Sequence, residues 1–171
     1  HVQSPAGSSV VVGATVVLYD GSPSHPDGNA LWDLADEAGV SIFGTSAKWL
    51  AAIEKAGVKP AQTHKLLALR TLLSTGSPLA PESFDYCYRD IKDRLMVASI
   101  SGGTDIISCF ALGNPLLPVY RGELQCRGLG MAVDVFNEAG APVRGKPGEL
   151  VCTRPFPSMP LPEGEGYELK A

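Results

Sequence analysis

The chain has 171 residues, of which 44% are hydrophobic and 19% charged, and its formal net charge is −4. This composition is typical of a globular protein with a sizeable core and argues against a disordered chain. The negative charge gives no support for a nucleic-acid or membrane-surface partner, and no apolar run in the sequence reaches the length of a membrane span.

Four short apolar runs in the first two-thirds of the chain predict β-strands, because they are bounded by turn-forming residues. These runs are residues 14–19, 40–43, 69–73 and 96–100.

Three segments between these strands have apolar residues at helical spacing. The first can be capped by Asp27 or Asn29, the second by Thr45 or Ser46, and the third begins at Pro81, a residue favoured in the first helical turn. Strands that alternate with helices predict a parallel sheet with helical crossovers.

Helical periodicity disappears after about Asn114. Strand patterns at 119–126, 131–136 and 149–153, separated by turn sequences, predict antiparallel pairing. The fold class that we expect is therefore α/β. It comprises a parallel sheet with flanking helices over residues 1–113, an antiparallel β subdomain over 114–155, and a disordered tail over 156–171.

The four cysteines are Cys87, Cys109, Cys126 and Cys152. They contain no CxxC pair and have no histidine at ligand spacing, so we do not expect a zinc site. Cysteines in apolar runs are usually buried free thiols, which favours a reducing, cytosolic location. Disulfides remain the alternative, because the number of cysteines is even.

Two loops rich in hydroxyl groups follow the third and fourth predicted strands, at residues 74–78 and 99–105. The carboxyl ends of parallel strands are where open sheets bind ligands. Glycines let backbone N–H groups approach an anion, hydroxyls donate to phosphate oxygens, and Asp105 offers an oxygen ligand suited to Mg²⁺. Either loop alone could be an ordinary tight turn, but the pair favours a nucleotide or phosphate site.

The other motifs that we considered do not predict a functional site. The segment 140–147 nearly matches a phosphate-binding P-loop, but Pro147 replaces the required hydroxyl and no helix pattern follows. A nucleophile elbow, GxSxG, does not occur. His25 and His64 lie in polar connections without a paired cysteine or acid, so we interpret them as surface histidines.

Several motifs carry a resemblance to a known family. They are Leu73–Leu79 and Ser99–Ser108, which include both loops, together with residues 18–23, 118–123 and 148–152. These motifs resemble the acetoacetyl-CoA synthetases, a branch of the adenylate-forming acyl-CoA synthetases, and the likeness extends from about Gly13 to about Pro160. The resemblance implies a ligase of lipid and ketone-body metabolism that uses ATP, acetoacetate and CoA.

The resemblance also implies roles for individual residues. Gly76-Ser77-Pro78 would lie against the adenine. Gly103 and Thr104 would contact the nucleotide, with Thr104 hydrogen-bonded to the α-phosphate, and Asp105 would bind Mg²⁺.

Gly102 bears on the size of the acid. Synthetases that act on acetate resemble this sequence but carry a bulky aromatic residue at the matching position, so a glycine would leave room for acetoacetate. The alternative is that Gly102 only serves the backbone of its loop. We expect Thr45 and Ser46, on another carboxyl-end loop, to form the opposite wall of the acyl pocket.

Parts of such an enzyme are not found in this sequence. A triphosphate-binding loop would precede residue 1, and a ribose-binding aspartate and a small domain with a catalytic lysine would follow Pro160. We therefore expect a fragment that does not complete the reaction alone. The alternatives are a non-catalytic truncated product with residual nucleotide or partner binding, and a synthetase for another short or medium acid.

Overall fold

A computed structural model describes residues 12–159 of the chain. Its centre is a parallel sheet of three strands in the order β1 (Ile42–Ser46), β2 (Thr71–Thr75) and β3 (Met96–Ser99). The predicted α/β class and parallel sheet are confirmed.

The predicted strand at 14–19 is wrong, because this segment has no regular structure. Its apolar side chains remain largely exposed, with Leu18 79% accessible to solvent. A β-branched run becomes a strand only beside a partner, and this run pairs with none of the described strands.

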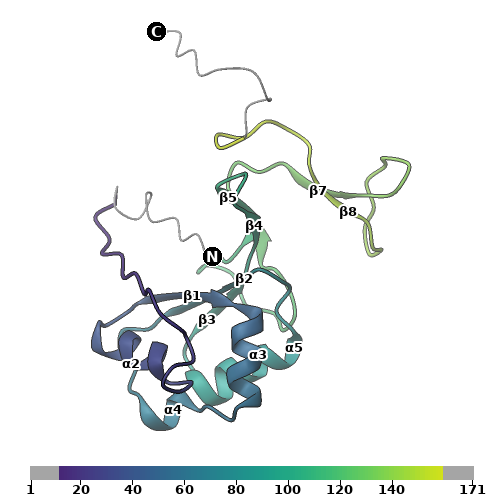
Figure 1. Cartoon of the computed structure of the whole chain (residues 1–171). Coiled ribbons are helices and arrows are strands. Elements are labelled where there is room, and N and C mark those ends of the chain that lie inside the picture. Colours follow the sequence, from purple (N-terminus) through teal and green to yellow (C-terminus); the bar gives the residue numbers. More distant parts are fainter. Residues whose placement is uncertain (1–11, 160–171) are drawn as a thin grey trace.

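All of the expected helices form, with one short addition. They are α2 (Ala30–Glu37), α3 (Ala47–Lys55), the one-turn α4 (Pro60–Thr63), and α5 (Pro81–Tyr86), which continues into the π-helical turn η1 (Cys87–Ile91). Figure 1 shows these helices gathered on one face of the parallel sheet.

The core lies between that face and the helices. Phe43 of β1 stacks on Trp32 of α2 with ring centroids 4.9 Å apart, and Trp49 of α3 lies 5.5 Å from Trp32. Leu72 and Val97 continue the same layer and are fully buried. Because side chains alternate across a strand, every second residue of β1, β2 and β3 faces the helices.

Antiparallel strands follow the parallel sheet. One sheet contains β4 (Ser101–Gly103), β5 (Ser108–Leu112) and β6 (Cys126–Arg127), and a second contains β7 (Val133–Phe136) and β8 (Glu149–Cys152). The predictions at 131–136 and 149–153 are confirmed as the β7–β8 pair, which extends away from the body in Figure 1.

The predicted strand at 119–126 is wrong apart from its last residue. Gly122, with φ of +80°, makes a turn there, and the N–H of Glu123 donates to the carbonyl of Tyr120 at 3.2 Å. The β4–β5 hairpin was not predicted, because Ser101-Gly102-Gly103 has the composition of a loop. The subdomain boundary at 113/114 stays a prediction.

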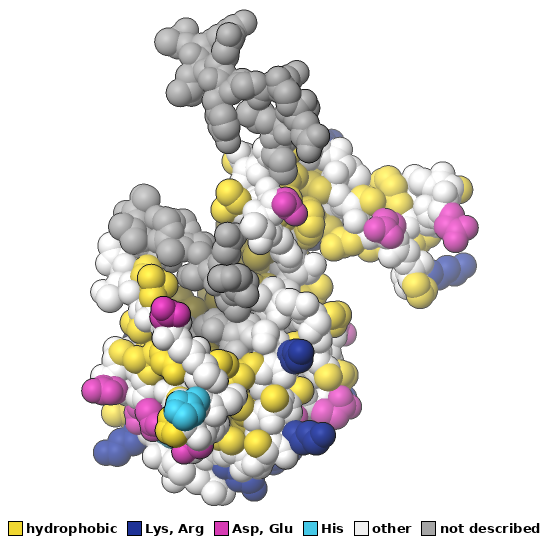
Figure 2. All heavy atoms as spheres, in the orientation of Figure 1, with side chains coloured by type: hydrophobic (Ala, Val, Ile, Leu, Met, Phe, Trp, Pro, Cys, Tyr) yellow, Lys and Arg dark blue, Asp and Glu magenta, His cyan; other side chains and the backbone are white. Residues whose placement is uncertain are grey.

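Large apolar side chains remain exposed on both parts of the described structure (Figure 2). Examples are Ile42 (61% exposed) on the body and Leu129 (95%) on the antiparallel part. No helix within residues 12–159 has the length and apolar character needed to cross a membrane. Residues 160–171 of the predicted tail lie outside the described residues.

Candidate active site

The three parallel strands end at one edge of the sheet. Thr45 of β1 is in register with Ser74 of β2, which is in register with Ser99 of β3. The N–H of Ile100 donates to the carbonyl of Ser74 at 2.8 Å, which joins the start of one candidate loop to the start of the other. The structure therefore places the starts of the two candidate loops side by side, and the meeting of their site residues stays a prediction.

The first loop, Gly76-Ser77-Pro78, is exposed and short. Gly76 has φ of +86°, a conformation that residues with a side chain rarely adopt, so glycine is required by the backbone. Leu79 is 4% exposed and anchors the loop in the core just before α5 begins. The loop is thus exposed to solvent at the edge of the sheet, and the buried Leu79 holds its end in place.

The second candidate segment is the tip of the β4–β5 hairpin. Thr104 and Asp105 are exposed in the turn, and the N–H of Ile107 donates to the carbonyl of Thr104 at 3.2 Å. Among residues 12–159 there is no group of three or more His, Cys, Asp and Glu side chains suited to a metal ion. Asp105 therefore offers one carboxylate, which fits Mg²⁺ because this ion usually takes few protein ligands beside phosphate and water oxygens.

Gly102 has a structural reason to be glycine. A Cβ atom at this position would lie 2.4 Å from the carbonyl oxygen of Ser108 and 3.0 Å from the Cα of Cys109, on the facing strand. A Cβ at Gly103 would meet nothing within 4 Å. The close approach of β4 and β5 therefore requires Gly102, whether or not an acyl group lies nearby.

Thr45 and Ser46 were expected to form one wall of the acyl pocket. In the structure the Ser46 side chain caps a helix and the Thr45 side chain is buried. The Ser46 hydroxyl caps α3 by accepting from the N–H of Trp49 at 3.2 Å. Thr45 is 6% exposed and faces the helix layer, as Phe43 does. The place of Thr45 and Ser46 in an acyl pocket stays a prediction.

The four cysteines are free thiols. Burial raises the pKa of the Cys87 thiol to about 12, so this group stays protonated at neutral pH. Burial also raises the pKa of Cys109. A thiol in such surroundings is a poor nucleophile, which argues against covalent catalysis by either cysteine.

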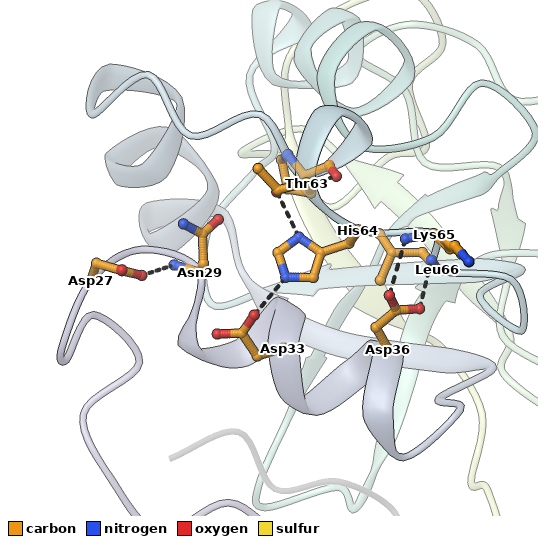
Figure 3. Close-up of polar contacts among 9 residues, drawn as sticks. Asp27, Asn29, Asp33, Asp36, Thr63, His64, Lys65 and Leu66 are labelled. Atoms are coloured by element: carbon orange, nitrogen blue, oxygen red, sulfur yellow. Dashed lines mark hydrogen bonds and ion pairs between the residues drawn. The ribbon is translucent and has the colours of Figure 1, made fainter.

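His64 was interpreted as a surface histidine without an acid, and this interpretation is wrong. Its side chain is 7% exposed, its Nε2 lies 2.8 Å from Oδ1 of Asp33, and its Nδ1 lies 2.7 Å from the Thr63 hydroxyl (Figure 3). These residues line a shallow cleft of about 640 Å³. Asp33 and His64 are 31 residues apart, so no local pattern predicts the contact.

Asp36 fixes the same region. Its carboxylate accepts from the backbone N–H groups of Lys65 and Leu66 at 3.0 and 2.8 Å (Figure 3). Leu66 is buried and has φ of 44°, so these bonds hold an unfavourable turn just before β2. The cluster around His64 and Asp36 thus joins α2 to the segment before β2.

We expect Asp36→Ala to lower the free energy of unfolding by about 1–3 kcal/mol, because two backbone donors lose a charged acceptor. Glu37→Ala is the matched control, since Glu37 is exposed and makes no side-chain hydrogen bond with the described residues. Denaturant titration of both variants measures the difference. Equal stabilities would contradict a role for Asp36 in holding the turn.

Comparisons with known proteins agree with the fold and the motifs. The family model described as "AMP-binding enzyme" matches residues 7–159. The chain is 59% identical over 165 residues to the acetoacetyl-coenzyme A synthetase of Rhizobium meliloti, covering 94% of this chain and 25% of that protein. It is 60% identical over 153 residues to the acetoacetyl-CoA synthetase of Danio rerio, covering 90% and 23%.

Two solved structures support the same relationship. The acetoacetyl-CoA synthetase from Streptomyces lividans superposes with a TM-score of 0.82 at 46% identity, over 90% of this chain and 24% of that chain. The anthranilate CoA ligase AuaEII, at 18% identity over 81% of this chain and 26% of its own, shares the fold with a TM-score of 0.62.

The chain spans about a quarter of the length of these synthetases. The resemblance inferred from the motifs is confirmed. Because the family match covers residues 7–159 of 171, this chain belongs to the AMP-binding enzyme family.

Proposed function

We propose that this chain forms part of an acetoacetate–CoA ligase. The observation that carries the proposal is the high identity to acetoacetyl-CoA synthetases over at least 90% of the chain. The position of both hydroxyl-rich segments at the carboxyl edge of the parallel sheet supports it, because this edge is where such sheets bind nucleotides.

The proposed reaction has two steps. An acetoacetate oxygen attacks the α-phosphorus of ATP, a P–O bond to the β-phosphate breaks, and acetoacetyl-adenylate and pyrophosphate form. The CoA thiolate then attacks the acyl carbon, and AMP leaves with the electrons of the broken C–O bond. Negative charge grows on the phosphate oxygens in the first step, so hydrogen-bond donors fixed beside them lower the barrier.

Residues of both loops have assigned places in this proposal. Gly76-Ser77-Pro78, the exposed loop after β2, borders the adenine. Gly103 and Thr104 contact the phosphates, with the Thr104 hydroxyl donating to an α-phosphate oxygen. Support for these places comes from the exposure of both segments and from the hydrogen bond that joins the starts of their loops at the sheet edge.

Asp105 is the residue that would hold Mg²⁺. The bound ion would offset the charge on the phosphate oxygens. The exposed carboxylate at the hairpin tip fits a site completed by phosphate and water oxygens.

The acyl group would lie beside Gly102 and the backbone of Thr45 and Ser46. The place of Gly102 in this pocket rests on the resemblance to the synthetases, because a Cβ at this position would point against the backbone of Ser108 and Cys109.

We place the protein in the cytosol and assign it small-molecule partners only. Free thiols at all four cysteines fit a reducing compartment. The net charge of −4 gives no basis for nucleic-acid binding.

A chimeric synthetase tests the proposal. In this chimera, residues 12–159 replace the matching segment of the Rhizobium meliloti synthetase, which supplies the remainder of the enzyme. We expect acetoacetyl-CoA to form from ATP, acetoacetate and CoA, with a kcat/KM at least about tenfold above that for acetate, the scale of discrimination by a differently sized apolar pocket. Anthranilate is the second competing acid. A folded chimera that prefers either competitor would contradict the proposed substrate.

A further inference from the structure

Three buried hydroxyl residues form a row across the parallel sheet. Thr45, Ser74 and Ser99 are in mutual register, one on each strand. They lie at or next to the carboxyl ends of the strands, just before the candidate loops. They are 6%, 0% and 7% exposed. Residues two positions earlier, Phe43 and Leu72 among them, form the apolar core on the same face, so the row marks a change from apolar to polar at the carboxyl edge.

The central hydroxyl of this row lacks a partner. Ser74 Oγ is fully buried and makes no hydrogen bond with any described residue. Buried hydroxyls in folded proteins are nearly always satisfied, by protein groups or by ordered water. Ser74 therefore requires a partner that residues 12–159 do not supply.

The strands that carry the row are close enough for one water molecule to bridge two of their hydroxyls. Neighbouring strands lie about 4.8 Å apart. A water molecule that makes hydrogen bonds of about 2.8 Å to hydroxyls on two such strands fits this separation. With Thr45 on one side and Ser99 on the other, a water beside Ser74 has the two or more polar partners that buried waters need.

Ser74 also connects both candidate loops. Gly76 of the first loop follows Ser74 by two residues. The carbonyl of Ser74 accepts from the N–H of Ile100, which precedes β4 and the hairpin tip. Any shift at Ser74 is therefore transmitted to both segments at the sheet edge.

We propose that the hydroxyl row binds an ordered water, and that Ser74 acts through this water as a positioning residue for the two candidate loops. The water holds the ends of three strands at a fixed separation. Because Ser74 faces the helix layer, it does not touch the reacting atoms. The kinetic part of this inference rests on the proposed function, whereas the water site does not.

Crystallography and kinetics on the chimeric synthetase test the inference together. The unsubstituted chimera should show a water within hydrogen-bond distance of Ser74 Oγ. Ser74→Ala should lose this water and raise the KM for ATP and for acetoacetate by about three- to tenfold, the equivalent of one hydrogen bond, with kcat within about twofold. Ser74→Thr keeps the hydroxyl and should retain the original KM values.

Two further variants separate hydrogen bonding from packing. Ser74→Cys preserves approximately the volume but bonds weakly, so it should behave like Ser74→Ala. Ser83→Ala removes another buried serine hydroxyl, in α5 and outside the row, and should leave both KM values unchanged.

The absence of a water at Ser74 in the unsubstituted chimera would overturn the inference. Unchanged KM values in Ser74→Ala would overturn the positioning role, because the Ser74 hydroxyl would then have no effect on the two loops. An inactive but folded chimera would overturn the proposed function instead, and the crystal structure would still decide whether the water site exists.

Discussion

Replacing Thr104 by Val, or Asp105 by Asn, is expected to slow adenylate formation by about 10²–10³-fold in the chimeric synthetase. Removal of one preorganised group beside a developing oxyanion has a cost of this size. Both side chains are exposed at the hairpin tip and contribute nothing to the core, so the fold should survive. Acetoacetate-dependent pyrophosphate release gives the rate, and the melting temperature reports the fold.

Asp93→Asn is the matched control for Asp105→Asn. Asp93 is also exposed, but it precedes β3 at the opposite, amino end of the strand. It should leave the rate unchanged. A destabilised Thr104 or Asp105 variant with the original rate per folded molecule would show that the side chain only supports the turn, and would remove it from the mechanism.

Gly102→Ala is expected to destabilise the protein by about 1–3 kcal/mol, whereas Gly103→Ala should change stability by less than about 0.5 kcal/mol. The two glycines are neighbours on β4 and differ in what a methyl group would meet. At Gly102 it overlaps the backbone of Ser108 and Cys109, which cannot move aside as a flexible side chain can, and at Gly103 it meets nothing within 4 Å. Denaturant titration of the two variants measures the difference.

The same pair distinguishes the two interpretations of Gly102. If the hairpin opened without cost, Gly102→Ala would be as stable as Gly103→Ala, which would contradict the steric explanation. A change in the preference between acetoacetate and acetate in such a stable variant would then assign Gly102 to the acyl pocket. Larger residues, including Trp, must displace the same backbone atoms.

Local patterns were sufficient for much of the fold. Helices α2, α3 and α5 follow from apolar spacing, from Ser46 as a cap and from Pro81 in the first turn. Their alternation with strands then determines the parallel sheet. The segment 14–19 has equally good strand composition, yet a strand also needs a neighbour, and sequence composition does not provide one.

The β4–β5 hairpin illustrates the opposite error. Gly102 and Gly103 have poor strand propensity, and the segment is a strand because it lies against β5 at a distance that only glycine allows. The contact between His64 and Asp33 was missed for a related reason. Residues far apart in sequence meet only after α2 packs beside the segment that precedes β2.

Some features of the candidate site could likewise be predicted from the sequence, and others depend on the packed structure. That the loops at 74–78 and 99–105 begin side by side follows from a general rule of parallel sheets, so sequence was enough for this step. The row of Thr45, Ser74 and Ser99 depends on the register of three strands, which spacing along the chain does not give. The burial of Thr45 likewise emerged only from the packed structure, whereas the cap bond of Ser46 was among the alternatives that the sequence offered.

Acetoacetate-dependent exchange of labelled pyrophosphate into ATP, measured with the chimeric synthetase and without CoA, tests the central proposal most directly. This exchange reports adenylate formation alone, the step assigned to the sheet edge formed by this chain. We predict exchange that requires acetoacetate and is nearly abolished by Thr104→Val. A folded chimera that shows no exchange, or that exchanges equally well without acetoacetate, would contradict the proposal that this segment activates acetoacetate.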